Sequence, residues 1–165
     1  MKKTLQNGGF DQLDRSILDI LQDNGRISVA DLARRIHLSQ PAVHNRIKRL
    51  ERAGIIDGYV TLVDREAAGY DLLCFIRLTV QPHTRELFEC WRDHVAKLPE
   101  VLECYHTAGG SDLTLKVVAR NHKALDTFIA EQLMTVGGVE RIETSVVLSA
   151  LKATTALPLK TGNNP

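Results

Sequence analysis

The chain has 165 residues, which suffices for one ordinary domain or two small ones, and 44% hydrophobic with 25% charged residues is a globular composition. The formal net charge of +1 hides an uneven distribution, since residues 26–52 carry seven basic and two acidic side chains while the chain from residue 61 onward is slightly acidic. This pattern is typical of a nucleic-acid-binding module joined to another domain. No apolar run approaches the roughly 20 residues that a membrane-spanning helix needs, so we expect no membrane segment.

The first sixty residues predict three helices from the spacing of their apolar side chains. Each helix has a residue that can begin or end it: Asn24–Gly25 ends the first, Ser28 begins the second, and Ser39 begins the third. The third helix is expected from about Gln40 to Ala53. A short disordered lead is expected before the first helix.

The rest of the chain predicts mainly strands. Residues 55–63 are β-branched and aromatic around an Asp-Gly pair, which indicates a short hairpin or an extended arm. The pattern then alternates strand, helix, strand, strand, helix, strand, which predicts a ferredoxin-like α+β sheet with both helices on one face. Its elements are expected at residues 72–80, 85–98, 101–107, 113–119, 123–134 and 139–148. Because the other sheet face needs cover, we expect a homodimer.

These patterns divide the chain into an N-terminal helix-turn-helix domain with a wing and a C-terminal βαββαβ domain. The expected ranges are 1–63 for the first domain, 64–71 for a linker, 72–159 for the second domain, and 160–165 for a disordered tail.

The second and third helices form a helix-turn-helix unit, in which the later helix enters the major groove of double-stranded DNA. If the apolar stripe of this helix packs inward, its early polar residues reach base edges and its later basic residues meet phosphates. Arg46 falls on the flank of the apolar stripe, so its stem is expected to pack while its guanidinium reaches the DNA backbone or a carboxylate. The candidate DNA-binding residues are Ser39, Gln40, Pro41, His44, Asn45, Arg46, Lys48, Arg49 and Arg52.

An ordered set of motifs resembles the Lrp/AsnC family of "feast/famine" transcription regulators. The motifs are LDRSIL (13–18), NGRIS (24–28), LSQPAV (38–43), RLERAGII (49–56), LPEVLEC (98–104), GGSD (109–112), VGGV (136–139) and KATTALPL (152–159). The resemblance implies a winged helix-turn-helix joined to a sensor domain, and dimers that assemble into octamers or related rings. It also implies a small effector, usually an amino acid, bound between sensor domains of neighbouring dimers. Such a regulator works in the cytoplasm, associated with the nucleoid.

The resemblance places the effector site at the turn of Gly109, Gly110, Ser111 and Asp112, with the loop of Thr135, Val136 and Gly137 nearby. Two glycines let the backbone approach a ligand carboxylate, and the carboxylate of Asp112 can hold an α-ammonium group. The alternative is a plain hairpin turn in which the aspartate satisfies backbone groups. Ser111 stands where the family usually has an aromatic residue, so the family's usual effector preference cannot be assumed for this chain. The start of the third helix also departs from the family, so the operator sequence cannot be assumed either.

Other classes of function remain as alternatives. Three cysteines without a C-x-x-C pair indicate free thiols in a reducing compartment, and the six histidines show no metal-ligand spacing. No nucleophile elbow, zinc-protease motif or phosphate loop is present, so we expect neither an enzyme nor a cofactor. An effector-independent regulator, a regulator that responds to metal or redox state, and an architectural DNA-binding protein stay open.

Overall fold

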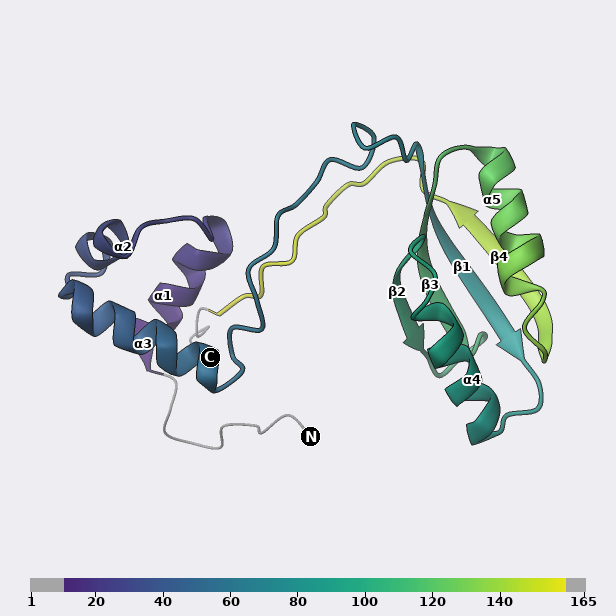
Figure 1. The fold of residues 1–165 in the computed structure, drawn as a ribbon, viewed down its shortest axis with the longest axis horizontal. Coiled ribbons are helices and arrows are strands. Elements are labelled where there is room, and N and C mark those ends of the chain that lie inside the picture. Colours follow the sequence, from purple (N-terminus) through teal and green to yellow (C-terminus); the bar gives the residue numbers. More distant parts are fainter. Residues whose placement is uncertain (1–10, 160–165) are drawn as a thin grey trace, which may run out of the picture. The chain divides into compact units, whose positions relative to one another are not determined.

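The structure, a computed structural model, describes residues 11–159, so the expected disordered lead and the tail at 160–165 lie outside the described part (Figure 1). The described residues form two compact units: 11–62 together with 152–159, and Val63–Leu151. The tail segment from Lys152, which we assigned by sequence to the second domain, thus groups with the first unit. No helix in the described range is long and apolar enough to cross a membrane.

The first unit contains α1 (Gln12–Asp23), α2 (Val29–Arg35) and α3 (Gln40–Arg52), the three helices that the sequence predicts. The expected N-caps are present, because the hydroxyls of Ser28 and Ser39 each accept an N–H of the helix that they begin. Its core joins all three helices and consists of Ile17, Leu18, Leu32, Ala33, Val43 and Leu50. Burying each of the larger side chains contributes about 1.5–3 kcal/mol.

The segment after α3 is an arm and not a hairpin. Gly54 ends the helix in the left-handed conformation, with φ of 67°. No strand forms in residues 53–71: the backbone has no regular secondary structure from Asp57 to Asp64, which Figure 1 shows as a drawn-out trace, and a turn follows at 65–69. Of the two forms that the sequence allowed, the structure therefore has the extended arm.

The tail is held on α1 by side chains that pair with its backbone. Gln22 donates from Nε2 to the carbonyl of Leu157 (3.1 Å) and accepts the N–H of the same residue at Oε1 (2.7 Å). Arg15 donates to the carbonyl of Leu159 (3.2 Å), whose side chain packs against the helical core. These contacts explain why the segment groups with the helices.

The second unit is the predicted βαββαβ sheet. Its elements are β1 (Leu72–Val80), α4 (Arg85–Val95), β2 (Val101–His106), β3 (Leu113–Ala119), α5 (His122–Phe128), the π-helical turn η1 (Ile129–Leu133) and β4 (Val139–Val146). The strands lie in the order β2-β3-β1-β4 with every neighbouring pair antiparallel. Figure 1 shows β1 and β3 between the two edge strands.

The core of this unit lies between the sheet and its two helices. Alternate residues of β1 and β3 are buried, and Trp91 of α4 with Leu125 and Phe128 of α5 packs over them. The opposite sheet face is mixed, because it combines exposed Phe75 and Tyr105 with charged side chains. The prediction of both helices on one face is therefore confirmed.

Boundaries differ from the prediction in the helices and at two strand ends, since the strand expected to residue 107 ends at His106. The helix expected to Leu98 ends at Val95, although Leu98 still packs against the core, and the last strand ends at Val146 and not at residue 148. The helix expected at 123–134 becomes π-helical in its second half, where the N–H of Met134 donates to the carbonyl of Ile129 (3.0 Å).

Candidate functional site

Helix α3, the predicted recognition helix, is fixed at its start and along its inner face. The Ser39 hydroxyl accepts the N–H of Ala42 (3.4 Å), and Pro41 occupies the first turn, where its missing N–H costs nothing. Val43 and Leu50 are fully buried against α1 and α2. The opposite face of α3 is thereby turned to solvent.

The predicted base-reading residues lie together on this outer face. Gln40, His44 and Asn45 are exposed in the first half of α3, as is Pro41. Gln40, Pro41 and His44, together with Val29 at the start of α2, line an open depression of about 590 Å³. The face thus offers amide and imidazole groups around a partly apolar hollow, a combination suited to base edges and thymine methyl groups.

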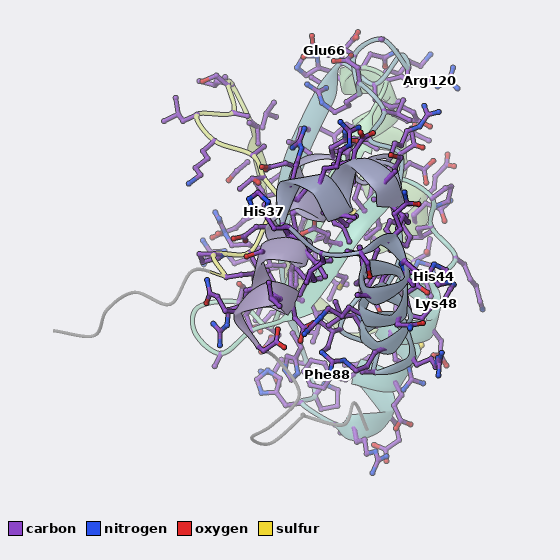
Figure 2. The ribbon with its side chains drawn as sticks, turned by 90° about the vertical axis from the view of Figure 1, so that its left-hand side faces the viewer. His37, His44, Lys48, Glu66, Phe88 and Arg120 are labelled. Atoms are coloured by element: carbon purple, nitrogen blue, oxygen red, sulfur yellow. The ribbon has the colours of Figure 1, made fainter. Side chains whose placement is uncertain are left out.

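Basic side chains continue the face toward the end of α3. Figure 2 shows His44 and Lys48 on the same side of the helix. Lys48 pairs with Glu51 (3.0 Å), which also accepts the Tyr59 hydroxyl of the arm (3.2 Å). The Lys48 ammonium lowers the pKa of Glu51, with a smaller contribution from Tyr59. Arg52 is exposed on the last turn.

Two of the predicted DNA-contacting arginines bond carboxylates at the start of α1. Arg46 donates from Nη1 to Asp11 (2.7 Å) and to Asp14 (2.8 Å), and its pKa is raised by these hydrogen bonds. This is the carboxylate contact that its place on the flank predicts. Arg49 was expected to face phosphates, yet its Nη2 donates to Asp14. Its side chain nevertheless remains 51% exposed, so the contact with Asp14 and a contact with DNA do not exclude each other.

Asp14 is the residue that sequence reasoning missed. Among residues 11–159 it is the one charged side chain that is buried, with 0% of its surface exposed. It also completes a reciprocal capping box, since the side chains of Asp11 and Asp14 each accept the other's N–H (2.9 and 3.1 Å). A signal was available, because Asp14 lies on the same helix face as buried Ile17 and Leu18.

The predicted effector turn connects β2 to β3. Gly109 has a φ of 142°, a conformation that side-chain-bearing residues rarely adopt. The turn is closed by two bonds from Thr107, whose N–H donates to the carbonyl of Asp112 (2.8 Å) and whose hydroxyl donates to that of Ser111 (3.0 Å). The N–H of Asp112 in turn donates to the carbonyl of Leu78 in β1 (2.9 Å).

The carboxylate of Asp112 already has two partners. One oxygen accepts the N–H of Val80 (2.8 Å) and the other lies 3.1 Å from Nε2 of His83. The Val80 hydrogen bond is the main reason that the pKa of Asp112 is lowered, and His83 adds to it. The rings of Phe88 and His106 lie next to each other, tilted by 31°, with centroids 4.2 Å apart. The sequence did not single out His83 or Phe88.

The second predicted effector loop follows η1 and comprises Thr135, Val136 and Gly137. The next residue, Gly138, has a φ of 86°, and its carbonyl accepts the N–H of Gln81 (2.7 Å). The loop therefore contacts the C-terminal end of β1, which the Asp112 turn also contacts. The structure brings the two predicted effector segments to the same strand end.

The cysteines and histidines offer little for metal binding. Within residues 11–159 no group of three His, Cys, Asp or Glu side chains is placed to hold a metal ion. Cys74 is buried and Cys104 half-buried, and burial raises the pKa of both thiols, whereas Cys90 is exposed. A raised pKa makes a thiol less reactive at neutral pH.

Comparisons with known proteins cover both units. Residues 10–57 match winged helix-turn-helix DNA-binding domains, and residues 73–157 match the Lrp/AsnC ligand binding domain. The leucine-responsive regulatory protein of Escherichia coli K12 is 35% identical over 152 residues, which are 92% of this chain and 93% of that protein.

Solved structures agree with the sequence relatives. A transcriptional regulator of Neisseria meningitidis in complex with L-methionine has a TM-score of 0.87 and 35% identity, covering 90% of this chain and 96% of that one. AsnC of Escherichia coli has a TM-score of 0.82 and 31% identity, covering 90% and 98%.

Proposed function

The chain belongs to the Lrp/AsnC family of transcriptional regulators, and on this premise we propose that its DNA contacts lie on the outer face of α3. The observation that carries the proposal is the sorting of side chains on this helix, with its apolar residues buried and its amide, imidazole and cationic groups exposed. Gln40, His44 and Asn45 would read bases, and Lys48 and Arg52 would meet phosphates. Ser39 and Pro41 would set the start of the helix beside the DNA, Arg46 would support it through Asp11 and Asp14, and the exposed part of Arg49 would also meet a phosphate.

We propose that the effector is an amino acid and that it binds at the C-terminal end of β1. Gly109, Gly110 and Ser111 would present backbone N–H groups to its carboxylate, and Asp112 would hold its ammonium. The loop of Thr135, Val136 and Gly137 would close the other side. The L-methionine bound to the Neisseria relative supports this ligand class. Because Ser111 is small and polar, the preferred side chain is expected to differ from that of relatives with an aromatic residue there.

In this proposal, effector binding and DNA binding are coupled through the assembly of the protein into dimers and larger rings. We propose a homodimer formed by the open sheet face, with dimers associating further into an octamer or a related ring. An amino acid bound between dimers would bias this assembly or the spacing of the α3 helices, and so change the affinity for DNA. The protein would act in the cytoplasm at the nucleoid, without a cofactor and without catalysis.

The DNA part is tested by selecting duplexes from a random pool with the full-length chain. Binding constants for the selected duplex and a scrambled one are then measured at the same salt concentration. A selected-to-scrambled ratio of about 10³ or more is the expected result for a regulator. A ratio near one would instead indicate an architectural DNA-binding protein.

The effector part is tested by thermal unfolding of the same protein with each of the twenty amino acids in turn. A ligand that binds only the native state raises the Tm, and a hundred-fold excess over Kd stabilises by about 2.7 kcal/mol. We expect a small number of amino acids to raise the Tm of the chain. If no amino acid does so, the proposed effector class is wrong.

A further inference from the structure

Asp14 joins α1 to the recognition helix through a compact charge network. Its Oδ1 accepts from Arg46, while its Oδ2 accepts from Arg49 and from the N–H of Asp11 (3.1 Å). Asp11 is the outer member of the network, since its side chain is 50% exposed and, of the two arginines, bonds Arg46 alone. Both carboxylates accept at both oxygens, since Asp11 accepts the N–H of Asp14 at Oδ1 (2.9 Å) and Arg46 at Oδ2 (2.7 Å). Asp14 differs in being fully buried and in accepting from Arg49 as well.

The side chains of Arg46 and Arg49 differ in how much of their surface remains exposed and able to contact DNA. Arg46 is 25% exposed and bridges both carboxylates, so most of its surface is used inside the protein. Arg49 is 51% exposed and gives Nη2 to Asp14. A guanidinium has five N–H donors in one rigid plane, so fixing one of its nitrogens sets the direction of the others.

We propose that Asp14 is a positioning residue for DNA recognition: it orients the Arg49 guanidinium so that its remaining donors meet a backbone phosphate in a fixed direction. The proposal rests on DNA binding through the outer face of α3. A phosphate contact of fixed direction sets the register of a protein on the duplex, although it carries no base information itself. Asp14 therefore acts on specificity through Arg49 without touching DNA.

Positioning can be separated from electrostatics and from plain stability. Removing a carboxylate near the DNA surface takes away one negative charge, which strengthens binding to every duplex alike. Losing the orientation of Arg49 instead weakens binding to the selected duplex relative to a scrambled one. The selected-to-scrambled ratio therefore reports positioning, and a change in Tm alone does not alter this ratio in a protein that remains folded.

The experiment compares Asp14→Asn with Asp11→Asn in the full-length chain. Both remove one carboxylate from the same network, and asparagine remains a good N-cap at position 11. Only the change at Asp14 affects Arg49 directly, because asparagine leaves Arg46 and Arg49 one neutral acceptor oxygen and replaces the other oxygen by an N–H donor. We expect Asp14→Asn to lower the ratio roughly ten-fold, the effect of one charge-assisted hydrogen bond, and Asp11→Asn to leave it within about two-fold.

Coupling to Arg49 completes the test. Arg49→Gln should lower the ratio as much as Asp14→Asn, and the double variant should be no worse than Arg49→Gln alone. The proposal is overturned if Asp14→Asn keeps the wild-type ratio, if Asp11→Asn lowers it equally, or if the two losses multiply. If circular dichroism shows that Asp14→Asn does not fold, Arg49→Lys decides, because lysine keeps the charge without the planar fork.

For Arg49→Lys, a roughly ten-fold lower ratio supports the proposal and a wild-type ratio overturns it. A wild-type chain that binds no duplex, or binds all duplexes equally, contradicts the proposed function itself. That failure is visible before any variant is made.

Discussion

Replacement of Gly138 by alanine tests how the second effector loop is attached to β1. Gly138 has a φ of 86°, and a Cβ atom there would lie 2.6 Å from the carbonyl oxygen of Gln81 and 2.7 Å from Cδ2 of Leu87. The leucine can rotate, but the carbonyl belongs to the residue whose N–H donates to Gly138 (2.7 Å). Relief of the overlap therefore requires the loop to move away from the strand end.

Two costs add in this variant. A left-handed conformation costs an alanine about 1–2 kcal/mol relative to glycine, and overpacking against the backbone costs about 1–3 kcal/mol. We expect Gly138→Ala to lower the free energy of unfolding by about 3 kcal/mol, measured by urea denaturation. The matched control is Gly137→Ala, because no atom lies within 4 Å of a Cβ at that position.

The control variant should stay within about 1 kcal/mol of wild type, since a glycine-to-alanine change without strain has small effects of either sign. The amino-acid-dependent rise in Tm should be weakened by Gly138→Ala, because the loop that contributes to the effector site is displaced. If both variants unfold at the same urea concentration as wild type, the described attachment of this loop is wrong.

Three further predictions concern single side chains. Asn45→Ala should cost about 1–3 kcal/mol of binding to the selected duplex and much less on scrambled DNA; equal losses in a titration would make Asn45 a backbone contact. Asp112→Ala should lower the free energy of unfolding by about 2 kcal/mol and Asp112→Asn by less, since an amide oxygen still accepts the N–H of Val80. Folding lowers the pKa of Asp112, so its carboxylate contributes in full to the free energy of unfolding above a pH of about 4. This contribution is lost as the pH falls through the folded pKa. In urea titrations, the free energies of unfolding of wild type and Asp112→Asn should therefore converge in acid. Gln22→Ala should release the tail at Leu157 and speed its limited proteolysis, and an unchanged cleavage rate would count against the two hydrogen bonds.

Much of the fold follows from local patterns in the sequence. The strands at Leu72–Val80 and Leu113–Ala119 are found at their expected residues, because short apolar and β-branched runs bounded by turn residues are typical of strands. The end of α4 was harder to predict. Leu98 is apolar and packs on the core, but it does so from a turn that follows the helix, so its spacing alone could not reveal the boundary.

Contacts between distant residues set the limits of prediction for the site. The outer face of α3 could be predicted because helical periodicity separates buried Val43 and Leu50 from exposed His44 and Asn45. The engagement of Arg49 could not, because its partner Asp14 lies 35 residues away on another helix. Pairing of that kind depends on how helices pack, and one sequence does not record it.

The same limit applies to Asp112. Sequence reasoning weighed a ligand-binding carboxylate against a residue that satisfies the backbone, and in the structure the carboxylate does accept a backbone N–H, that of Val80. The binding of an effector by Asp112 stays a prediction. It is compatible with the bond to Val80, because the other carboxylate oxygen contacts His83, which a ligand ammonium would replace. If a ligand ammonium replaces His83 at Asp112, the effect of ligand binding is transmitted to the end of β1, because the same carboxylate bonds the N–H of Val80.

The measurement that tests the account most directly is the affinity of the full-length chain for its selected duplex with and without a stabilising amino acid. Fluorescence anisotropy at fixed salt should show a change in Kd of about 5- to 150-fold, the usual range of coupling between two sites. The same titration on Asp112→Asn should show no change, while its Kd without amino acid stays near that of wild type. An amino acid that raises the Tm but leaves Kd unaltered, or a Kd change that persists in Asp112→Asn, would contradict an effector site at Asp112 that controls DNA binding.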